Sequence, residues 1–182
     1  MLKELTQKDL NIKLTGYFNY GISEKIKRSS YMVLENLKSF LQKNNATFEL
    51  ITHKKPIYSS EDGVKCFGID IAQTAPIIII KVEKSFFAVI VSGERGRINL
   101  EFIVHILGYK KGRLATKDEV TGITGFHPGS IPLVGHNLPC IFDKRLFRYP
   151  FVYGGSGEPT CTLKINPKDL EKLNKTVAKL DE

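Results

Sequence analysis

Apolar side chains recur at helical spacing in the N-terminal part of the chain. They return every three or four residues and stop before Asn44-Asn45. A helix with one apolar face places its apolar side chains at this period. The pattern therefore predicts an amphipathic helix that begins after a cap at Ser23 and ends at about Lys43. The side chains on its apolar face are Ile26, Val33, Leu34, Leu37 and Leu41.

Further along the chain, the apolar pattern changes to the period of β-strands. In residues 48–52 apolar and polar side chains alternate, which predicts a strand with one buried face. Residues 76–82 (PIIIIKV) are apolar on both faces, which is typical of a central strand. A partner strand over 86–91 follows a polar turn. Shorter strands are predicted at 140–142, 151–153 and 160–165.

Capping residues mark where the remaining helices begin. A Ser, Thr or Asn side chain at this position accepts a hydrogen bond from the free N–H groups of the first turn. The four capping residues are Ser59, Asn99, Thr116 and Asn166. The helix after Asn166 is predicted to continue through Leu180, because one apolar stripe carries Leu170, Leu173, Val177 and Leu180.

The order of these elements indicates the fold class. After the first helix it reads β-α-β-β-α-α-β-β-β-α, which lacks the regular alternation of a doubly wound fold. An α+β fold is favoured, with a curled mixed sheet (a partial barrel) flanked by helices.

Composition and charge narrow the function classes. The 182 residues are 42% hydrophobic and 25% charged, an ordinary balance for one globular domain. The sequence has no apolar run of membrane-spanning length and no signal-peptide pattern, so we expect a cytoplasmic protein. Three widely spaced cysteines argue against a disulfide framework or a zinc site. The net charge of +8 favours an anionic partner, with nucleic acid the first candidate.

The stretch GFHPGSIPLVGHNLPC, residues 125–140, is the strongest candidate for a functional site. Three prolines fix backbone torsions, three glycines permit unusual ones, and the stretch contains no acidic residue. Such a loop holds the backbone on one path, which can present bare N–H groups to a ligand. Its histidines, His127 and His136, are candidates for chemistry, whereas His105 is expected to be solvated.

For several other stretches the sequence predicts a structural role and no chemistry. Residues 92–96 (SGERG) and 154–159 (GGSGEP) are glycine-rich but lack the Gly-Lys-Ser/Thr of a P-loop, so ordinary turns are predicted. Cys66 and Cys161 occupy positions that predict core packing. No Ser-His-Asp order and no nucleophile elbow are visible in the sequence.

Several stretches together resemble the YbaK family, whose members are aminoacyl-tRNA deacylases. They are HKKPIYSSEDGVKCFGI, SGERGRINLEFIVHILG, LATKDEVTGITGFHPGSIPLVGH, LPCIFD and NPKDLEKLN. The likeness covers residues 46–182 and leaves residues 1–45 as an N-terminal helical extension. Members hydrolyse the ester of a wrongly charged tRNA, typically one carrying alanine or cysteine on the proline tRNA. The implied partners are a tRNA acceptor end with a small amino acid and an aminoacyl-tRNA synthetase, without cofactor, metal or membrane.

The resemblance also implies roles for individual residues. In the family the glycine-proline loop lines the aminoacyl pocket and its N–H groups face the ester carbonyl. The implied catalytic set is Gly129, Ser130, Ile131, Gly135 and His136. The implied substrate-binding set is His53, Thr74, Ala75, Lys81 and Asp143. The basic residues expected to contact acceptor-stem phosphates are Arg95, Arg97, Lys110, Lys111 and Arg113.

The sequence departs from the family pattern at two places. Leu133 stands where the family loop has proline, because Pro132 comes one position early. Ala75 stands where the family has a functional lysine at the start of the first central strand. Lys81 lies six residues further on, about 20 Å along a strand, so it cannot simply replace that lysine. Lys65, in the preceding helix, is a candidate to approach the pocket.

These departures leave three hypotheses. The first is a free-standing editing hydrolase, in which a water or the ribose hydroxyl of the terminal adenosine completes the chemistry without a protein general base. The second is a module that kept the fold, lost the chemistry, and binds tRNA or a synthetase. The third is hydrolysis of an ester outside tRNA. The loop is retained almost whole, which favours the first.

Overall fold

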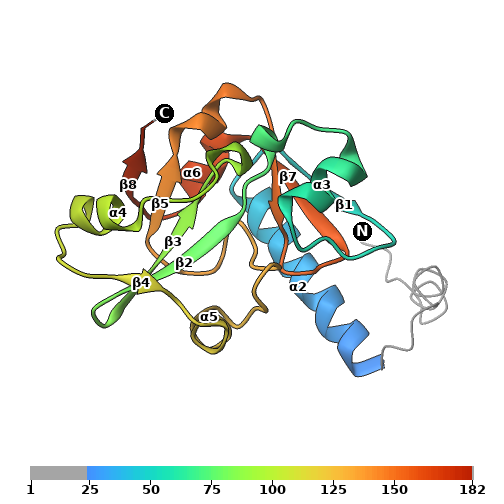
Figure 1. The fold of residues 1–182 in the computed structure, drawn as a ribbon. Coiled ribbons are helices and arrows are strands. Elements are labelled where there is room, and N and C mark those ends of the chain that lie inside the picture. Colours follow the sequence, from blue (N-terminus) through green and yellow to red (C-terminus); the bar gives the residue numbers. More distant parts are fainter. Residues whose placement is uncertain (1–23, 182) are drawn as a thin grey trace, which may run out of the picture.

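Two β-sheets with surrounding helices make up residues 24–181, the part of the chain that the computed structural model describes (Figure 1). One sheet has five strands in the order β4-β2-β3-β5-β8, and the other has three in the order β1-β7-β6. The predicted α+β class is confirmed, and the described strands form two sheets without a closed barrel. The predicted cap at Ser23 lies outside the described residues.

The five-stranded sheet mixes antiparallel and parallel pairs. β2 (Ile77–Val82) and β3 (Ser85–Ile90) form an antiparallel hairpin. β4 (Arg113–Leu114) pairs antiparallel with the other edge of β2. Beyond β3, the sheet continues through two parallel pairs, first with β5 (Cys140–Asp143) and then with β8 (Thr176–Leu180). The isoleucine strand therefore lies between two neighbours, as its two apolar faces predict.

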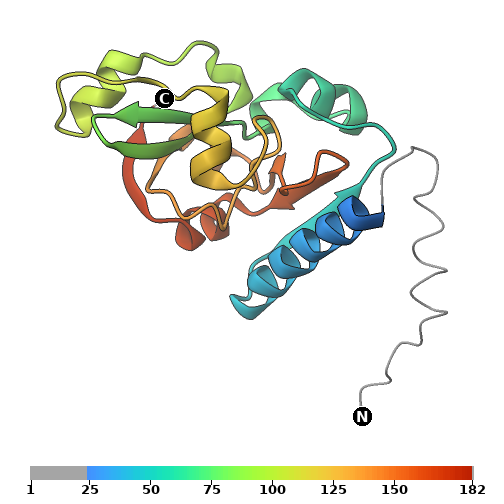
Figure 2. The ribbon, with the colours of Figure 1, turned by 90° about the horizontal axis from the view of Figure 1, so that it is seen from below.

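The three-stranded sheet is antiparallel and carries the long helix. β7 (Cys161–Ile165) pairs with β1 (Phe48–Thr52) on one side and with β6 (Val152–Gly155) on the other. α2 (Glu24–Lys43) runs alongside β1, as Figure 2 shows. Leu37 and Leu41 of α2 are buried in the main hydrophobic cluster. The helix predicted up to about Lys43 is thus present, whereas a domain boundary at residue 45 stays a prediction.

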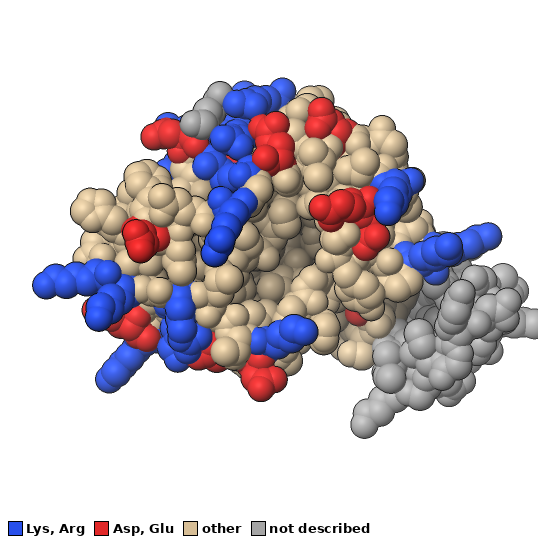
Figure 3. Space-filling view, in the orientation of Figure 1, with Lys and Arg blue, Asp and Glu red and all other residues tan. Residues whose placement is uncertain are grey.

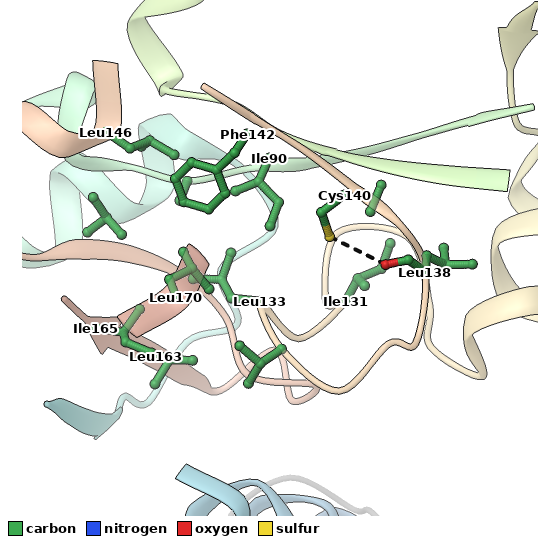
Figure 4. Packing of buried hydrophobic residues seen from close by; sticks show 14 of the residues in the cluster. Ile90, Ile131, Leu133, Leu138, Cys140, Phe142, Leu146, Leu163, Ile165 and Leu170 are labelled. Carbon is green, nitrogen blue, oxygen red and sulfur yellow. Dashed lines mark hydrogen bonds between the residues drawn. The ribbon is translucent and has the colours of Figure 1, made fainter. Parts of the chain in front are cut away.

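A short contact joins the two sheets where β6 meets the segment before β2. Thr74 and Tyr153 form a parallel bridge, and the Ala75 N–H donates to the Tyr153 carbonyl at 2.7 Å. Side chains from both sheets and from the glycine-proline loop fill one core, in which Leu133 and Leu163 lie near one another (Figure 4). A second cluster, on the other face of the five-stranded sheet, packs against α4 (Leu100–Ile106).

The predicted helix starts are present with their caps. α3 (Ser60–Phe67) begins after Ser59, whose hydroxyl accepts a hydrogen bond from the first turn. α5 (Lys117–Thr124) has both hydrogen bonds of a capping box between Thr116 and Glu119. Asn side chains likewise cap α4 and α6 (Pro167–Leu173). The connecting 3₁₀ helices are η1 (Ile71–Gln73), η2 (Gly93–Arg95) and η3 (Lys144–Arg148).

Two predictions from the apolar pattern are wrong. The last helix ends at Leu173, and residues 176–180 form β8 instead, because their backbone pairs with β5 and buries Leu180 at the sheet edge. Cys66 was expected in the core but is exposed, because α3 turns Gly63 inward and leaves Cys66 on its outer side.

Candidate functional site

A cavity of about 170 Å³ lies where the two sheets meet. Its wall is formed by α3 with the preceding loop, the segment leading into β2, the glycine-proline loop, and β6 with the turn into β7. The face drawn in Figure 3 is hollowed near its middle, with Lys and Arg side chains on several sides. Of the ten predicted catalytic and substrate-binding residues, five line the cavity: Thr74, Ala75, Gly129, Ser130 and Ile131.

The glycine-proline loop reaches the cavity through a tight turn over residues 127–130. The Ser130 N–H donates to the His127 carbonyl at 3.0 Å, and Gly129 has a φ of +89°. Proline at the second position and a left-handed glycine at the third are the signature of a type II turn. The Ser130 hydroxyl donates to the same carbonyl at 3.0 Å. The local sequence His-Pro-Gly-Ser therefore fixes this part of the wall.

β6 ends in two glycines, and the loop lies directly against them. The Leu133 N–H donates to the Gly155 carbonyl at 2.9 Å. A Cβ atom on Gly154 would lie 2.7 Å from the Leu133 side chain. Glycine is required here because any side chain would push β6 and the loop apart.

Two backbone N–H groups of the loop remain available at the cavity. Those of Ser130 and Leu133 donate to protein carbonyls, whereas those of Gly129 and Ile131 have no acceptor among the described residues. Both Gly129 and Ile131 line the cavity. A backbone N–H without a protein partner is a strong donor that water or a ligand can use.

A small apolar residue, Ala75, stands at the position of the family lysine. Ala75 is 1% exposed and lines the cavity beside Thr74. The Thr74 hydroxyl donates to the Ile71 carbonyl at 2.7 Å and lies 2.9 Å from the Ser60 hydroxyl. Lys65 is exposed on α3 and does not line the cavity. Among residues 29–181, whose side chains the structure describes, no Lys or Arg lines the cavity, so none of them replaces the family lysine there.

Glu158 supplies the one charged side chain among the described residues that line the cavity. It lies in the turn between β6 and β7. The Ser156 hydroxyl stabilises this turn by donating to the Cys161 carbonyl at 2.7 Å. Burial raises the pKa of Glu158 above its ordinary value, and a hydrogen bond with Ser30 of α2 works in the opposite direction. Glu158 is therefore a lining residue whose carboxylate is partly removed from water and reaches Ser30 of α2.

His53 does not line the cavity itself but contacts Thr162, which does. Its Nδ1 is 2.6 Å from the Lys55 carbonyl, which only accepts, so Nδ1 carries the proton of the neutral ring. Nε2 then accepts from the Thr162 hydroxyl at 3.1 Å. Thr162 itself lines the cavity, and Phe67 packs edge-on against the imidazole. His53 thus orients Thr162 and does not line the cavity itself.

Two predicted substrate-binding residues lie away from the cavity because other groups already hold them. Asp143 is fully buried, and its carboxylate accepts from Arg95 at 2.6 and 2.8 Å and from the Ser92 N–H at 3.0 Å. Lys81 pairs with Glu119 of α5 at 2.8 Å. Both ion pairs connect elements of the fold, and neither Asp143 nor Lys81 lines the cavity.

Two predicted catalytic residues also lie outside the cavity wall. His136 is 4% exposed, and its Nδ1 accepts from the Leu138 N–H at 3.2 Å. Burial lowers the pKa of His136 and keeps the ring neutral. Gly135 is exposed, and it does not line the cavity. The loop leaves the wall after Ile131, which separates both residues from the free N–H groups.

The basic residues predicted to contact tRNA fall into two groups. Arg95 pairs with Asp143, and Arg113 pairs with Glu119 at 2.7 Å. Arg97, Lys110 and Lys111 are exposed. A contact of these residues with tRNA stays a prediction.

Among the side chains that the structure describes, those of residues 29–181, no group of three or more His, Cys, Asp or Glu is arranged to hold a metal ion. None of the described helices combines the length and the apolar character needed to cross a bilayer.

Sequence reasoning missed the contribution of the β6–β7 turn. It predicts an ordinary turn over 154–159, but Gly154, Gly155 and Glu158 all line the cavity. Tyr58 also lines it and is 56% exposed. The two adjacent glycines were the available signal, because glycine at a strand end marks a close approach of another backbone.

Comparison with known proteins places this fold in a family. The family model for the aminoacyl-tRNA editing domain matches residues 54–173. A solved structure of a proposed trans-editing enzyme for prolyl tRNA synthetase is 26% identical, with a TM-score of 0.71 over 80% of this chain and 94% of that chain. The hypothetical protein APE2540 is 24% identical, with a TM-score of 0.72 over 79% and 96%. No curated protein sequence matches this chain. The chain belongs to the family of aminoacyl-tRNA editing domains.

Proposed function

We propose that this protein hydrolyses the ester between a small amino acid and the 3′-terminal ribose of a wrongly charged tRNA. The observation that carries the proposal is the pair of unpartnered N–H groups on Gly129 and Ile131 at a small cavity. Family membership supplies the substrate class, because editing domains act on aminoacyl-tRNA.

In the proposed reaction a water oxygen adds to the ester carbonyl carbon, and the carbonyl oxygen takes up negative charge. The Gly129 and Ile131 N–H groups donate to this oxyanion. The bond to the ribose oxygen then breaks, this oxygen takes up the proton that the attacking water has given up, and the free amino acid leaves. Each fixed donor of this kind contributes about 10²–10³-fold to kcat. The proton of the attacking water passes through a second water or the neighbouring ribose hydroxyl, without a protein general base.

The size of the cavity supports a small amino acid such as alanine or cysteine. Its volume is about 170 Å³, and Gly129, Gly154 and Gly155 lie in its wall. A larger side chain would have to displace backbone, because the loop and β6 already lie in contact. A site of this kind acts as a sieve, which hydrolyses what fits and excludes what does not.

The surroundings of the cavity support binding of the tRNA end. Tyr58 presents an exposed aromatic ring at the cavity, where the terminal adenine could stack. Arg97, Lys110 and Lys111 are exposed cations for the phosphates of the acceptor stem. The similarity to a proposed trans-editing enzyme for prolyl tRNA synthetase supports the proline tRNA and its synthetase as partners.

A second candidate function is a binding module without hydrolysis. Ala75 favours it, because the cavity lacks a lysine at the position where the family has one. Such a module would bind tRNA with the same affinity whether or not the N–H groups of the loop stay in place.

Purified protein should be offered alanyl-, cysteinyl-, seryl- and prolyl-tRNA, and release of the amino acid should be followed over time. The proposal predicts hydrolysis of alanyl- or cysteinyl-tRNA, with little loss of the larger prolyl ester. Binding of all four without release beyond the spontaneous rate would support the binding module and contradict the hydrolase. Hydrolysis of simple amino-acid esters without any effect of tRNA would place the substrate outside tRNA.

A further inference from the structure

The carboxylate of Glu158 is the feature of the cavity that the proposed reaction does not use. Hydrolysis through backbone N–H groups needs no acid in the wall, and the stretch 125–140 contains none. Yet Glu158 lines the cavity and carries the one charge among its described lining residues. A charge that is partly removed from water gains free energy from a partner of opposite sign, which a ligand can supply.

The turn that carries Glu158 is held in place. Its own N–H donates to the Ser156 hydroxyl at 3.3 Å, and its carbonyl accepts from the Cys161 N–H at 3.1 Å. Three residues before it, Gly155 is pinned to the loop through the Leu133 N–H. The backbone of Glu158 is therefore fixed relative to the loop that carries Gly129 and Ile131.

No cation of the described chain neutralises this carboxylate. Among residues 29–181, whose side chains the structure describes, Glu158 takes part in no ion pair, and its side chain is hydrogen-bonded to the neutral hydroxyl of Ser30. None of the lining residues that the structure describes is Lys or Arg. A cationic group of a ligand would therefore meet a single, unopposed negative charge there.

An aminoacyl ester brings such a cation with it. Its α-ammonium group stands on the carbon next to the ester carbonyl, so the ammonium nitrogen and the developing oxyanion are only three bonds apart. We propose that Glu158 binds the α-ammonium group of the aminoacyl ester and restricts the site to esters whose amino group is free. This inference rests on the proposed function and names the part of the substrate that it recognises.

The same carboxylate could instead serve as a general base for the attacking water. The two roles differ in what they require of the substrate. An ammonium-binding carboxylate favours an ester with a free amino group over one that is acylated on nitrogen. A general base speeds the hydrolysis of both to the same degree, because it acts on the water.

The test measures binding with analogues that cannot be hydrolysed. Alanine joined through an amide to 3′-amino-3′-deoxyadenosine is titrated by calorimetry, alongside its N-acetyl derivative. Wild type should bind the free amine about 10-fold or more tightly than the N-acetyl form, as expected for a hydrogen bond to a charged group. Glu158→Gln should lose this preference by weakening the free amine alone.

Glu101→Gln provides the matched control, because Glu101 is exposed on α4 and does not line the cavity. It should retain the wild-type preference. Glu158→Gln is expected to fold, since burial already favours the neutral form of the group. Glu158→Asp, which keeps the charge but shortens the reach, gives an independent check and should show an intermediate preference.

The outcomes separate this inference from the proposed function. Equal preference in wild type and Glu158→Gln overturns the inference, even if wild type hydrolyses alanyl-tRNA. Equal weakening of both analogues in Glu158→Gln, or no binding of either by wild type, also overturns it. A preference that depends on Glu158, in a protein that hydrolyses no aminoacyl-tRNA, upholds ammonium binding and overturns the hydrolase.

Discussion

Gly155 and Ile131 approach so closely that no side chain fits between them. A Cβ atom on Gly155 would lie 2.0 Å from the Ile131 carbonyl oxygen. The adjacent hydrogen bond from the Leu133 N–H to the Gly155 carbonyl, at 2.9 Å, holds the two segments together. β6 thus acts as the support on which the cavity loop rests, and the position of the free N–H groups depends on it.

This contact predicts that Gly155→Ala disrupts both stability and activity. The new methyl group must displace the Ile131 carbonyl, and overpacking of this kind costs about 1–3 kcal/mol of the free energy of unfolding. Urea unfolding measures the loss. Gly122→Ala is the matched control, because Gly122 lies inside α5 with no atom in the way, and alanine there should stabilise by about 0.5–1 kcal/mol. Equal stability of Gly155→Ala and wild type would contradict the close contact.

Gly129→Ala should reduce activity more than its effect on stability explains. Gly129 has a φ of +89°, and alanine in this conformation costs about 1–2 kcal/mol. Gly108 has a φ of +80° with nothing within 4 Å of an added Cβ, so Gly108→Ala should cost a similar amount of stability. Deacylation of alanyl-tRNA should fall about 10-fold or more in Gly129→Ala and stay unchanged in Gly108→Ala. Similar rates in both would show that the turn at Gly129 does not position donors.

Tyr58→Ala should weaken the binding of charged tRNA and leave the chemical step nearly intact. Stacking of a base on an aromatic ring contributes about 1–3 kcal/mol, which corresponds to roughly 5- to 150-fold in KM. Steady-state kinetics with alanyl-tRNA measure the change. Tyr58→Phe should behave as wild type, and so should Tyr31→Ala, which removes an equally exposed ring from α2. If KM is unchanged in Tyr58→Ala, the terminal adenine does not stack on Tyr58.

Asp143→Asn should destabilise the fold and flatten its response to acid. Burial alone would raise the pKa of Asp143, but hydrogen bonds from Arg95, Ser92 and Arg145 hold it below its ordinary value. The carboxylate therefore stabilises the fold above the ordinary pKa of Asp, and this contribution is lost as the pH falls through the lowered pKa.

At neutral pH, breaking this buried pair should cost about 3–5 kcal/mol of the free energy of unfolding. Urea unfolding at a series of pH values should show the gap between wild type and Asp143→Asn closing toward acid. Glu101→Gln should follow wild type throughout. A gap that stays constant with pH would mean that the pair with Arg95 does not control the ionisation of Asp143.

The elements with strong local signals could be predicted from the sequence. The capping side chains of Ser59 and Thr116 mark helix starts that the structure confirms, because a cap depends on neighbours in the chain. The apolar stripe through Val177 and Leu180 led to a wrong prediction of helix. Apolar spacing over so few residues fits a strand as well as a helix, and these residues form β8. These residues become a strand because they pair with the edge of β5, which is distant in the sequence, and no local pattern reveals that pairing.

The residues of the candidate site likewise include some that local sequence predicts and some that it does not. The turn through Pro128 and Gly129 follows from its own four residues, so its place at the cavity could be anticipated. Glu158 could not, because it reaches the cavity only when β6 lies against the loop. Asp143 was assigned to the substrate by family likeness, whereas its partner Arg95 lies 48 positions away and holds it in the interior.

The central claim is that the Ile131 N–H donates to the oxyanion of the ester. Replacing that amide by an ester, with the isoleucine side chain kept, exchanges the N–H for an oxygen and leaves every side chain in place. Ile123, exposed on α5, receives the same replacement as a control. With alanyl-tRNA as substrate, kcat should fall about 10²–10³-fold for the change at Ile131 and stay at the wild-type value for the change at Ile123. An unchanged kcat at Ile131 would contradict the account.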